Sequence, residues 1–305
     1  MPWYFFAFLA PALWALSNHI DKYILSRYLK NGVIGALVIF GGIIGFIFSL
    51  GVFIFVPHKL LALSFINEII IVFNGALLII ALIPYYYALS KDETSIVTPL
   101  YQTIPIFSYL LGFFILGERI SPIQIFAGFL IIIGALIISL NLDSSKIKIK
   151  KDVFFLMMLS SFLVALYFLI FKFVAIHENF WGTTFWEYIG VVFIGIFLFI
   201  FIGNYRRQFL KILKENSISI ISINGLNEVI TIGSKLLVNY ASILAPLALV
   251  TVANGFQPFF VFLYGILLTL FFPSFAKEKI NKKYILQKSF AIIIMFIGMY
   301  LLIFV

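Results

Sequence analysis

The sequence predicts an all-α membrane protein in which ten transmembrane helices form two inverted five-helix repeats. Three observations carry this prediction: an apolar composition, a series of long apolar runs, and small motifs that recur between the two halves of the chain. Of its 305 residues, 63% are hydrophobic and only 11% are charged. A soluble domain has about 25% charged residues, and lipid accepts the excess apolar surface that a soluble core of this size could not hide.

Each apolar run is about 20 residues long, the length that a helix needs to cross a hydrocarbon core of about 30 Å. The runs are continuous, whereas barrel strands show about ten residues of alternating polarity, so helices are expected. The first run follows no basic region and carries Trp3 and Tyr4, which predicts a first span with an interfacial aromatic belt and not a cleaved signal peptide. The expected spans are 3–20, 33–56, 69–89, 95–116, 122–141, 153–176, 182–203, 217–239, 242–272 and 284–305.

Short motifs recur in the same order and at a nearly constant offset in residues 1–143 and 152–305, which a basic linker at 144–151 separates. An odd number of spans in each half would insert the second half in the opposite sense. Such inverted repeats recur in secondary transporters that bind substrate at the repeat interface and work by alternating access. The open alternative is a duplication that merely built a larger bundle. The recurrences are Leu13-x-Ala15-Leu16 with Leu163-x-Ala165-Leu166, Asn74-Gly75 with Asn224-Gly225, Ser95-Ile96-x-x-Pro99-Leu100 with Ser242-Ile243-x-x-Pro246-Leu247, Pro105 with Pro258, and Gly134 with Gly298.

Leu116-Gly117-Glu118-Arg119-Ile120-Ser121 precedes a helix in which Gly128 and Gly134 form a G-x5-G pattern. This arrangement resembles the signature of EamA-type transporters of the drug/metabolite transporter superfamily, whose ten-span plan fits essentially the whole chain. The second half departs from the signature, with Lys277-Glu278-Lys279-Ile280 in place of the turn. The resemblance implies transport but no particular cargo, because the superfamily includes exporters of amino acids and relatives that carry sugar phosphates or nucleotide sugars.

The 217–239 span carries a polar stripe at helical spacing. An ionisable residue within a span costs about 2.5–3.5 kcal/mol on insertion scales, so it usually faces the bundle interior or a wet cavity. A structural Glu228–Lys235 pair, bridged by water or Thr231, is the open alternative to substrate contact, and an interfacial belt would equally explain Tyr85. The candidate substrate contacts are Asn224, Glu228, Thr231 and Lys235 on this span, with Asn74 and Tyr85 at the equivalent positions of the 69–89 span.

The fourth and ninth spans each contain two prolines, which remove backbone donors and loosen carbonyls within the membrane. Broken helices are therefore expected there, with Gln102 between the first pair of prolines and Asn254 and Gln257 beside the second. These amides are candidate substrate contacts, and a packing kink tied together by amides is the alternative. Trp14 and Asn18 share a face of the first span and could line the same cavity.

Three ionisable residues are expected at membrane interfaces and not in the site. Lys22 and Lys172 could snorkel to the headgroups, and Glu187 lies in a Trp-rich span start. No catalytic residue, metal site or cofactor is expected, because the chain has no Cys, its three His are scattered, and it lacks a phosphate-binding loop.

The expected function is a secondary transporter, most simply an exporter, of a small polar or zwitterionic, amino-acid-like metabolite. Its expected partners are membrane lipid, a small-molecule substrate and protons as the coupling ion. Nucleic acid is excluded, although the net charge is +9, because the cations gather between the apolar runs. A monomer should suffice. The alternatives are a sugar-phosphate or nucleotide-sugar antiporter, a lipid-flippase-like protein and a structural scaffold.

The expected location is the plasma or cytoplasmic membrane, as a multi-pass protein. Most of the 21 Lys and Arg residues fall in the connections that follow odd-numbered spans. The positive-inside rule then places these connections in the cytoplasm and both termini outside. The family resemblance implies the opposite orientation, with both termini inside, and the sequence leaves the two alternatives open.

Overall fold

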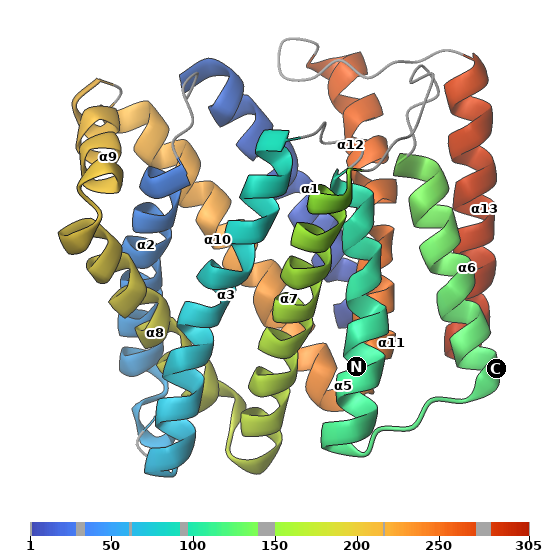
Figure 1. Cartoon of the computed structure of the whole chain (residues 1–305), viewed down its shortest axis with the longest axis horizontal. Coiled ribbons are helices and arrows are strands. Elements are labelled where there is room, and N and C mark those ends of the chain that lie inside the picture. Colours follow the sequence, from blue (N-terminus) through green and yellow to red (C-terminus); the bar gives the residue numbers. More distant parts are fainter. Residues whose placement is uncertain are drawn as a thin grey trace. The chain divides into compact units, whose positions relative to one another are not determined.

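The computed structural model describes residues 2–28, 34–60, 63–91, 97–139, 150–215, 217–272 and 282–304. Within these ranges every regular element is a helix (Figure 1). The α-helices of the first half are α1 (Trp3–Tyr28), α2 (Ile34–Phe55), α3 (Phe65–Lys91), α5 (Ile104–Leu116) and α6 (Pro122–Ser139). Those of the second half are α7 (Lys151–His177), α8 (Phe180–Phe201), α9 (Gly203–Glu215), α10 (Ser217–Leu244), α11 (Leu247–Ala253), α12 (Gln257–Phe271) and α13 (Lys282–Phe304).

The described helices make the chain an integral, multi-pass membrane protein, with fewer clear spans than the ten expected. Seven stretches of helix are long and apolar enough to cross a bilayer. The apolar stretch Ile39–Phe55 of α2 is shorter than these seven. Helices α1 and α10 are not among the seven. The seven stretches are Phe65–Tyr85, Pro99–Leu116, Pro122–Ser139, Lys151–His177, Phe180–Phe201, Leu247–Phe271 and Tyr284–Phe304.

The fourth and ninth expected spans are both broken by 3-10 segments, as their prolines predict. Segment η2 (Thr98–Thr103) begins beside Pro99 and gives way to α5, which has Pro105 in its first turn. In the second half, α11 follows Pro246, and segment η3 (Asn254–Phe256) leads into α12. Proline lacks a backbone donor, so the α-helical hydrogen-bond pattern is interrupted at each of these points.

Close approach of backbones brings the chain into two compact units, each of which combines segments from both halves. Unit one comprises Met1–Leu16, Ala81–Leu169 and Ser234–Val305, and unit two comprises Ser17–Ile80 and Ile170–Gly233. The boundary at 144–151 that the sequence predicts between repeats lies almost wholly outside the described residues.

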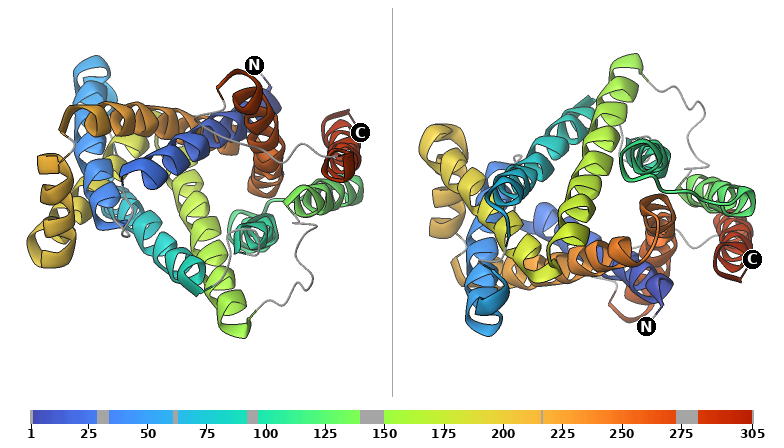
Figure 2. Two further views of the ribbon diagram at one scale, coloured as in Figure 1. Left: turned by 90° about the horizontal axis from the view of Figure 1, so that it is seen from above. Right: turned by 90° about the horizontal axis from the view of Figure 1, so that it is seen from below.

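In unit one, α6 and α13 lie side by side (Figures 1 and 2). A Cβ added to Gly134 would lie 2.9 Å from the Ala291 carbonyl oxygen, and one added to Gly298 would lie 2.8 Å from the Ala127 carbonyl oxygen. Because the later residue of each helix meets the earlier residue of the other, the two helices run antiparallel. Small residues at these points allow the backbones to approach closely, as at other membrane helix interfaces.

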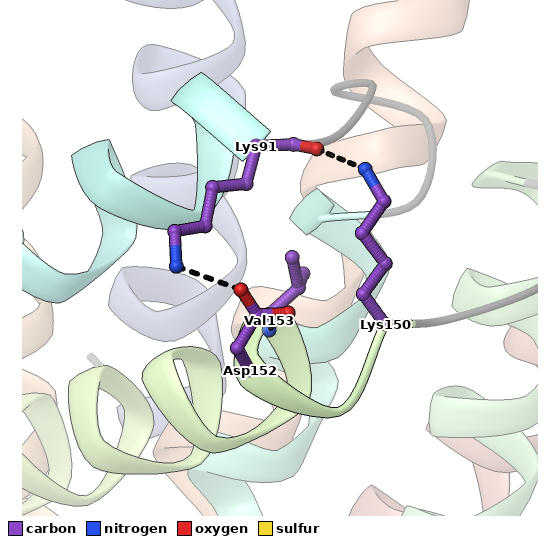
Figure 3. Close-up of polar contacts among 4 residues, drawn as sticks. All are labelled: Lys91, Lys150, Asp152 and Val153. Carbon is purple, nitrogen blue, oxygen red and sulfur yellow. Dashed lines mark hydrogen bonds and ion pairs between the residues drawn. The ribbon is translucent and has the colours of Figure 1, made fainter.

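The start of α7 is joined to the end of α3 within unit one (Figure 3). Lys91 Nζ lies 2.7 Å from Asp152 Oδ2, and Lys150 Nζ donates to the Lys91 carbonyl oxygen. The Val153 amide donates to Asp152 Oδ1 at 3.0 Å, so the carboxylate also caps the first turn of α7. Lys91 lies in the last turn of α3 and Asp152 in the first turn of α7, so each charge complements the dipole of its own helix.

In unit two, α8 packs against α3 and α2 through glycines. A Cβ on Gly75 would lie 2.1 Å from the Glu187 carbonyl oxygen, and one on Gly190 would lie 2.0 Å from the Val72 carbonyl oxygen. These contacts leave no room for a side chain at either glycine, so α3 and α8 cross with their backbones in contact. Between α2 and α8, a Cβ on Gly42 would lie 3.2 Å from the Gly195 Cα.

Candidate functional site

Helix α10 turns its polar stripe inward and its apolar face outward. Asn224 is 2% exposed and Lys235 is 6% exposed, while Leu226 and Val229 on the opposite face are 58% and 61% exposed. Glu228 and Thr231 are half-buried. An apolar face toward lipid and a polar face toward protein is the arrangement expected for a membrane helix that lines a polar interior.

In unit two, the polar stripe of α10 faces α1 and α2. Thr231 Oγ1 lies 3.0 Å from Ser17 Oγ. A Cβ built on Gly41 of α2 would lie 3.7 Å from Glu228 Oε1, so this carboxylate occupies the space beside a residue without a side chain. Asn18, next to Ser17, is exposed. The first half of α10 is therefore joined to α1 by hydroxyl groups and directs a carboxylate at the α2 backbone.

A second polar contact links α10 to α1 one turn earlier. Asn227 Nδ2 donates to Asp21 Oδ1 at 2.6 Å. Asn227 is 4% exposed and was not among the residues that the sequence predicted. Its position three residues after Asn224 places it on the edge of the same stripe, which is the signal that would have identified it.

Unit two also contains a buried carboxyl that the sequence assigned to a membrane interface. The interfacial position predicted for Glu187 is wrong, because its side chain is 0% exposed. Asn74 Nδ2, itself on a side chain that is 1% exposed, donates to Glu187 Oε1 at 3.2 Å.

The pattern of small and polar residues on α8 would have revealed this position. The buried face of α8 recurs every three or four residues, and Glu187 falls within it. Trp181, which is exposed, and Trp186, which is half-buried, lie on other faces of α8, and tryptophans near a span start are typical of a membrane interface. The buried residues of α8 are Gly182, Thr183, Thr184, Glu187, Tyr188, Gly190, Val191 and Gly195.

Two lysines predicted at interfaces behave differently from each other. Lys22 is exposed, as expected for a side chain that snorkels. Lys172 is 7% exposed within unit two, so the prediction that it reaches an interface is wrong. A buried lysine in a membrane helix needs polar neighbours, which is the behaviour of residues that line a pathway.

In unit one, the second half of α10 carries a buried cation beside an aromatic ring. Lys235 Nζ lies 5.2 Å from the centroid of the Tyr167 ring, and Tyr167 is 1% exposed. Within about 6 Å the face of an aromatic ring attracts a cation, more strongly where water is excluded. On the preceding residue, Ser234 Oγ donates to the Ala10 carbonyl oxygen of α1 at 2.6 Å, and Trp14 of α1 is half-buried.

One buried amide that the sequence missed lies four residues beyond Lys235. Asn239 is 1% exposed, and neither its Oδ1 nor its Nδ2 has a hydrogen-bond partner among the described residues. Leaving such a group unpaired costs roughly 1–3 kcal/mol, so a buried amide of this kind usually meets water or a ligand. It extends the inward stripe of α10 by one more turn.

Tyr85 is half-buried in unit one and packs against a second tyrosine. Its ring is 5.0 Å from that of Tyr101, and Tyr101 Oη lies 3.1 Å from Ser160 Oγ. Ser160 in turn donates to the Ala81 carbonyl oxygen at 2.7 Å. The two tyrosines thus connect α3, η2 and α7 through a chain of polar and ring contacts.

The 3-10 breaks of the fourth and ninth helices meet in unit one. A Cβ on Gly255 of η3 would lie 3.3 Å from Gln102 Oε1, which comes from η2. Asn254 and Gln257 flank this glycine and are half-buried, and Asn254 Oδ1 is a buried atom without a hydrogen-bond partner in the described part of the chain. Amides therefore gather where both helices lose their regular hydrogen bonds, which is an arrangement that can hold a polar ligand.

The turn that follows α5 has a structural role that explains its residues. Gly117 ends α5 with φ 66° and ψ 19°, a left-handed conformation that favours glycine. The next residue, Glu118, accepts a hydrogen bond through Oε2 from the Leu247 amide at 2.8 Å. Glu118 thereby caps the first turn of α11, so a motif in the first half of the chain supports the broken helix of the second.

Two comparisons with known proteins agree with this architecture. Residues 1–140 match the EamA-like transporter family, which confirms the resemblance that the sequence motifs predicted. A solved protein crystal structure with 14% sequence identity superimposes with a TM-score of 0.60 over 98% of this chain and 94% of that chain. At this identity the likeness shows a shared fold and no more. No curated protein matches the sequence.

Proposed function

We propose, from the EamA-like transporter family match of residues 1–140, that this integral membrane protein is a secondary transporter of a small polar or zwitterionic metabolite. The observation that carries the proposal is the polar stripe of α10, which presents Glu228, Thr231 and Lys235 to the protein and its apolar residues to lipid. Ionisable groups are retained within membrane helices chiefly where they bind ions or substrates.

An inverted repeat with alternating access is the mechanism we infer for this transporter. Two contacts between positions that correspond in the two halves support it. Gly134 and Gly298 make reciprocal contacts in the antiparallel α6–α13 pair, and Gln102 meets Gly255, which has the same offset from it as Pro258 has from Pro105. Contacts that join equivalent positions are those expected along a two-fold axis.

The chemistry of the polar side chains favours a substrate with both charges. In unit two, Glu228 can attract a cationic group, and Asn224 supplies an amide. In unit one, Lys235, held over Tyr167, can attract a carboxylate, and Asn239 and Asn254 supply amides.

Glu228 is the residue we assign to proton coupling. Its carboxylate faces the Gly41 backbone, where it can release a proton when substrate arrives and recover it when substrate leaves. In proteoliposomes, Glu228→Gln should abolish the dependence of uptake on a pH gradient while leaving exchange of substrate across the membrane measurable. Glu178→Gln, which removes a half-buried carboxylate between two spans, is the matched control. Uptake by Glu228→Gln that still follows the pH gradient would remove Glu228 from coupling.

The substrate class can be assigned by thermal stabilisation of the purified protein. Amino acids, polyamines, nucleobases and sugar phosphates form a suitable panel, and a ligand present at 100 times its Kd raises the free energy of unfolding by about 2.7 kcal/mol. Stabilisation by a zwitterionic amino acid that is lost in Lys235→Gln is the expected result. If no member with a carboxylate stabilises the protein, the zwitterion assignment fails.

A sugar-phosphate or nucleotide-sugar antiporter is the second candidate, and one observation favours it. Lys172 and Lys235 are 7% and 6% exposed, so each unit contains a buried cation. A buried cation in either unit would suit a substrate with a phosphate group. Stabilisation by sugar phosphates, but by no amino acid, would establish this candidate in place of the first.

A further inference from the structure

Helix α9 connects α8, one of the seven membrane-spanning stretches, to α10 and is too short to cross the bilayer itself. Its 13 residues rise about 20 Å, against a hydrocarbon core of about 30 Å. The preceding span ends at Phe201, and Ile202 leaves the helical conformation with φ −101° and ψ 83°. The ten-span plan has no place for this helix. Since α9 follows directly on the end of a span, it lies at the membrane surface.

The apolar side of α9 is fixed to the body of unit two. Phe209 and Ile212 are each 6% exposed and pack in one cluster with Ile24 of α1 and Phe40 of α2. The Phe209 ring centroid lies 4.9 Å from that of Phe40 and 6.0 Å from that of Phe199 on α8. These edge-to-face contacts hold α9 in one rotation about its axis.

This rotation turns a row of cations outward. Arg206, Arg207, Lys211 and Lys214 are all exposed, and Arg207 Nε makes a hydrogen bond of 3.3 Å to the Gly203 carbonyl oxygen of its own helix. Leu210 is 49% exposed and lies among them, one turn from Arg206, Arg207 and Lys214. A face that combines cations with one exposed leucine is typical of a helix lying in the headgroup region of a bilayer.

We propose that the basic face of α9 binds the headgroups of anionic phospholipids. Arginine forks match phosphate oxygens in two parallel hydrogen bonds, and each cation near an anionic leaflet adds to the attraction. Leu210 enters the boundary between headgroups and acyl chains. Because anionic lipid is concentrated in the cytoplasmic leaflet, the α8–α10 connection faces the cytoplasm. This assignment agrees with the positive-inside alternative, which places both termini outside.

Lipid titration of the purified full-length protein in detergent tests this proposal. Short-chain phosphatidylglycerol should raise the melting temperature in a saturable way, and short-chain phosphatidylcholine should not. The variant Arg206→Gln with Arg207→Gln should need roughly 5- to 25-fold more phosphatidylglycerol for half the effect, since each cation contributes a factor of about five. The matched control is Arg119→Gln, an exposed cation in a connection that follows an even-numbered span, which should shift the midpoint less than about twofold.

Three results would overturn the proposal. The α9 variant and the control could respond equally to phosphatidylglycerol, which would mean that the basic face does not bind it. Inorganic phosphate at the same concentration could stabilise the protein as well as the lipid does, which would assign the site to free anions. Phosphatidylcholine could match phosphatidylglycerol, which would show that headgroup charge is irrelevant.

A spin label provides an independent measurement of the depth of α9. The natural chain contains no Cys, so Leu210→Cys and Asn204→Cys each introduce a single labelling position. In vesicles with phosphatidylglycerol, a label at 210 should collide more often with oxygen, which dissolves in lipid, than with a water-soluble nickel chelate. A label at exposed Asn204 serves as the reference. Equal access of the nickel chelate to both labels would show that Leu210 does not enter the bilayer.

Discussion

Asn74 of α3 donates a hydrogen bond to Glu187 of α8 across a distance of 3.2 Å, and both side chains are buried inside unit two. The bond lies beside a close contact between the two helix backbones, since a Cβ on Gly75 would lie 2.1 Å from the Glu187 carbonyl oxygen. Polar recognition and close packing are therefore combined at one helix crossing.

Removing the donor from this pair should destabilise the fold. Asn74→Leu takes a hydrogen bond from a buried carboxyl, and we expect a loss of about 1–3 kcal/mol, measured as a lower midpoint of denaturant unfolding in detergent. Asn204→Leu, at an exposed position of α9, should leave the midpoint nearly unchanged. Glu187→Leu combined with Asn74→Leu should recover part of the loss, because both polar partners are then removed together. No recovery in the double variant would show that the two residues act separately.

The contact between α3 and α8 should not tolerate a methyl group. Gly190→Ala places a Cβ 2.0 Å from the Val72 carbonyl oxygen, so the helices must separate. The expected cost is about 1–3 kcal/mol in the free energy of unfolding. Gly225→Ala on α10 is the matched control, because nothing lies within 4 Å of its added Cβ. Circular dichroism during heating measures both, and equal melting temperatures would contradict the close crossing.

Acid should remove one surface contact of unit two at a predictable pH. Asn67 Nδ2 donates to Glu178 Oε1 at 2.7 Å, and this bond, followed by one from the Ser64 amide, lowers the pKa of Glu178 below its usual 4.5. A group with a depressed folded pKa contributes stability above its unfolded pKa and loses it as the pH falls through the folded value. The contribution should thus be complete at neutral pH and decline as the pH falls below the usual value of 4.5.

The variant Asn67→Ala isolates this effect. Its melting temperature should fall below that of the natural protein at pH 7, and the difference should shrink as the pH falls below about 4. Asn204→Ala should show no such pH dependence. A difference for Asn67→Ala that stays constant from pH 7 to pH 3 would mean that the Glu178 charge does not take part.

The cap that Glu118 provides should depend on an acceptor at its tip. Glu118→Ala removes the oxygen that accepts from the Leu247 amide, and we expect a loss of about 0.5–2 kcal/mol, the range measured for helix caps. Glu118→Gln keeps an acceptor oxygen and should lose less. Arg119→Ala, at the exposed neighbouring position, should leave the melting temperature nearly unchanged. If Arg119→Ala lowers the melting temperature as much as Glu118→Ala does, the hydrogen bond to the Leu247 amide is not the source of the stability that Glu118 provides.

Much of the helical plan follows from local chemistry, so it could be predicted from the sequence. Pro99, Pro105, Pro246 and Pro258 stand at helix breaks, and 3-10 segments lie beside all of them except Pro246. Pro11 and Pro84, by contrast, lie within continuous helices. The inward direction of Asn224 and Lys235 follows from helical spacing and the cost of charge in lipid. The expected spans do not include α9, because its 13 residues are too short and too basic to cross a membrane. The separation of its apolar and basic residues onto different faces is the signal that indicates a helix there.

The environments of Glu187 and Lys172 could not be predicted in the same way. Both residues lie among apolar neighbours in the sequence, and their burial depends on helices far away in the chain. Glu187 meets Asn74, more than a hundred residues earlier, through a crossing made possible by two glycines. Composition and spacing identify which face of a helix is buried, but not the helix that packs against it. The sequence beside the tryptophans therefore predicts a membrane interface for Glu187 and does not reveal its contact with α3.

The antiparallel α6–α13 pair has a consequence for the protein during its synthesis on the ribosome. Gly134 and Ala127 are synthesised more than a hundred and fifty residues before Ala291 and Gly298, which cover them. For about half of translation, α6 therefore leaves its small residues uncovered by their partner helix. A chain cut short before α13 keeps them uncovered.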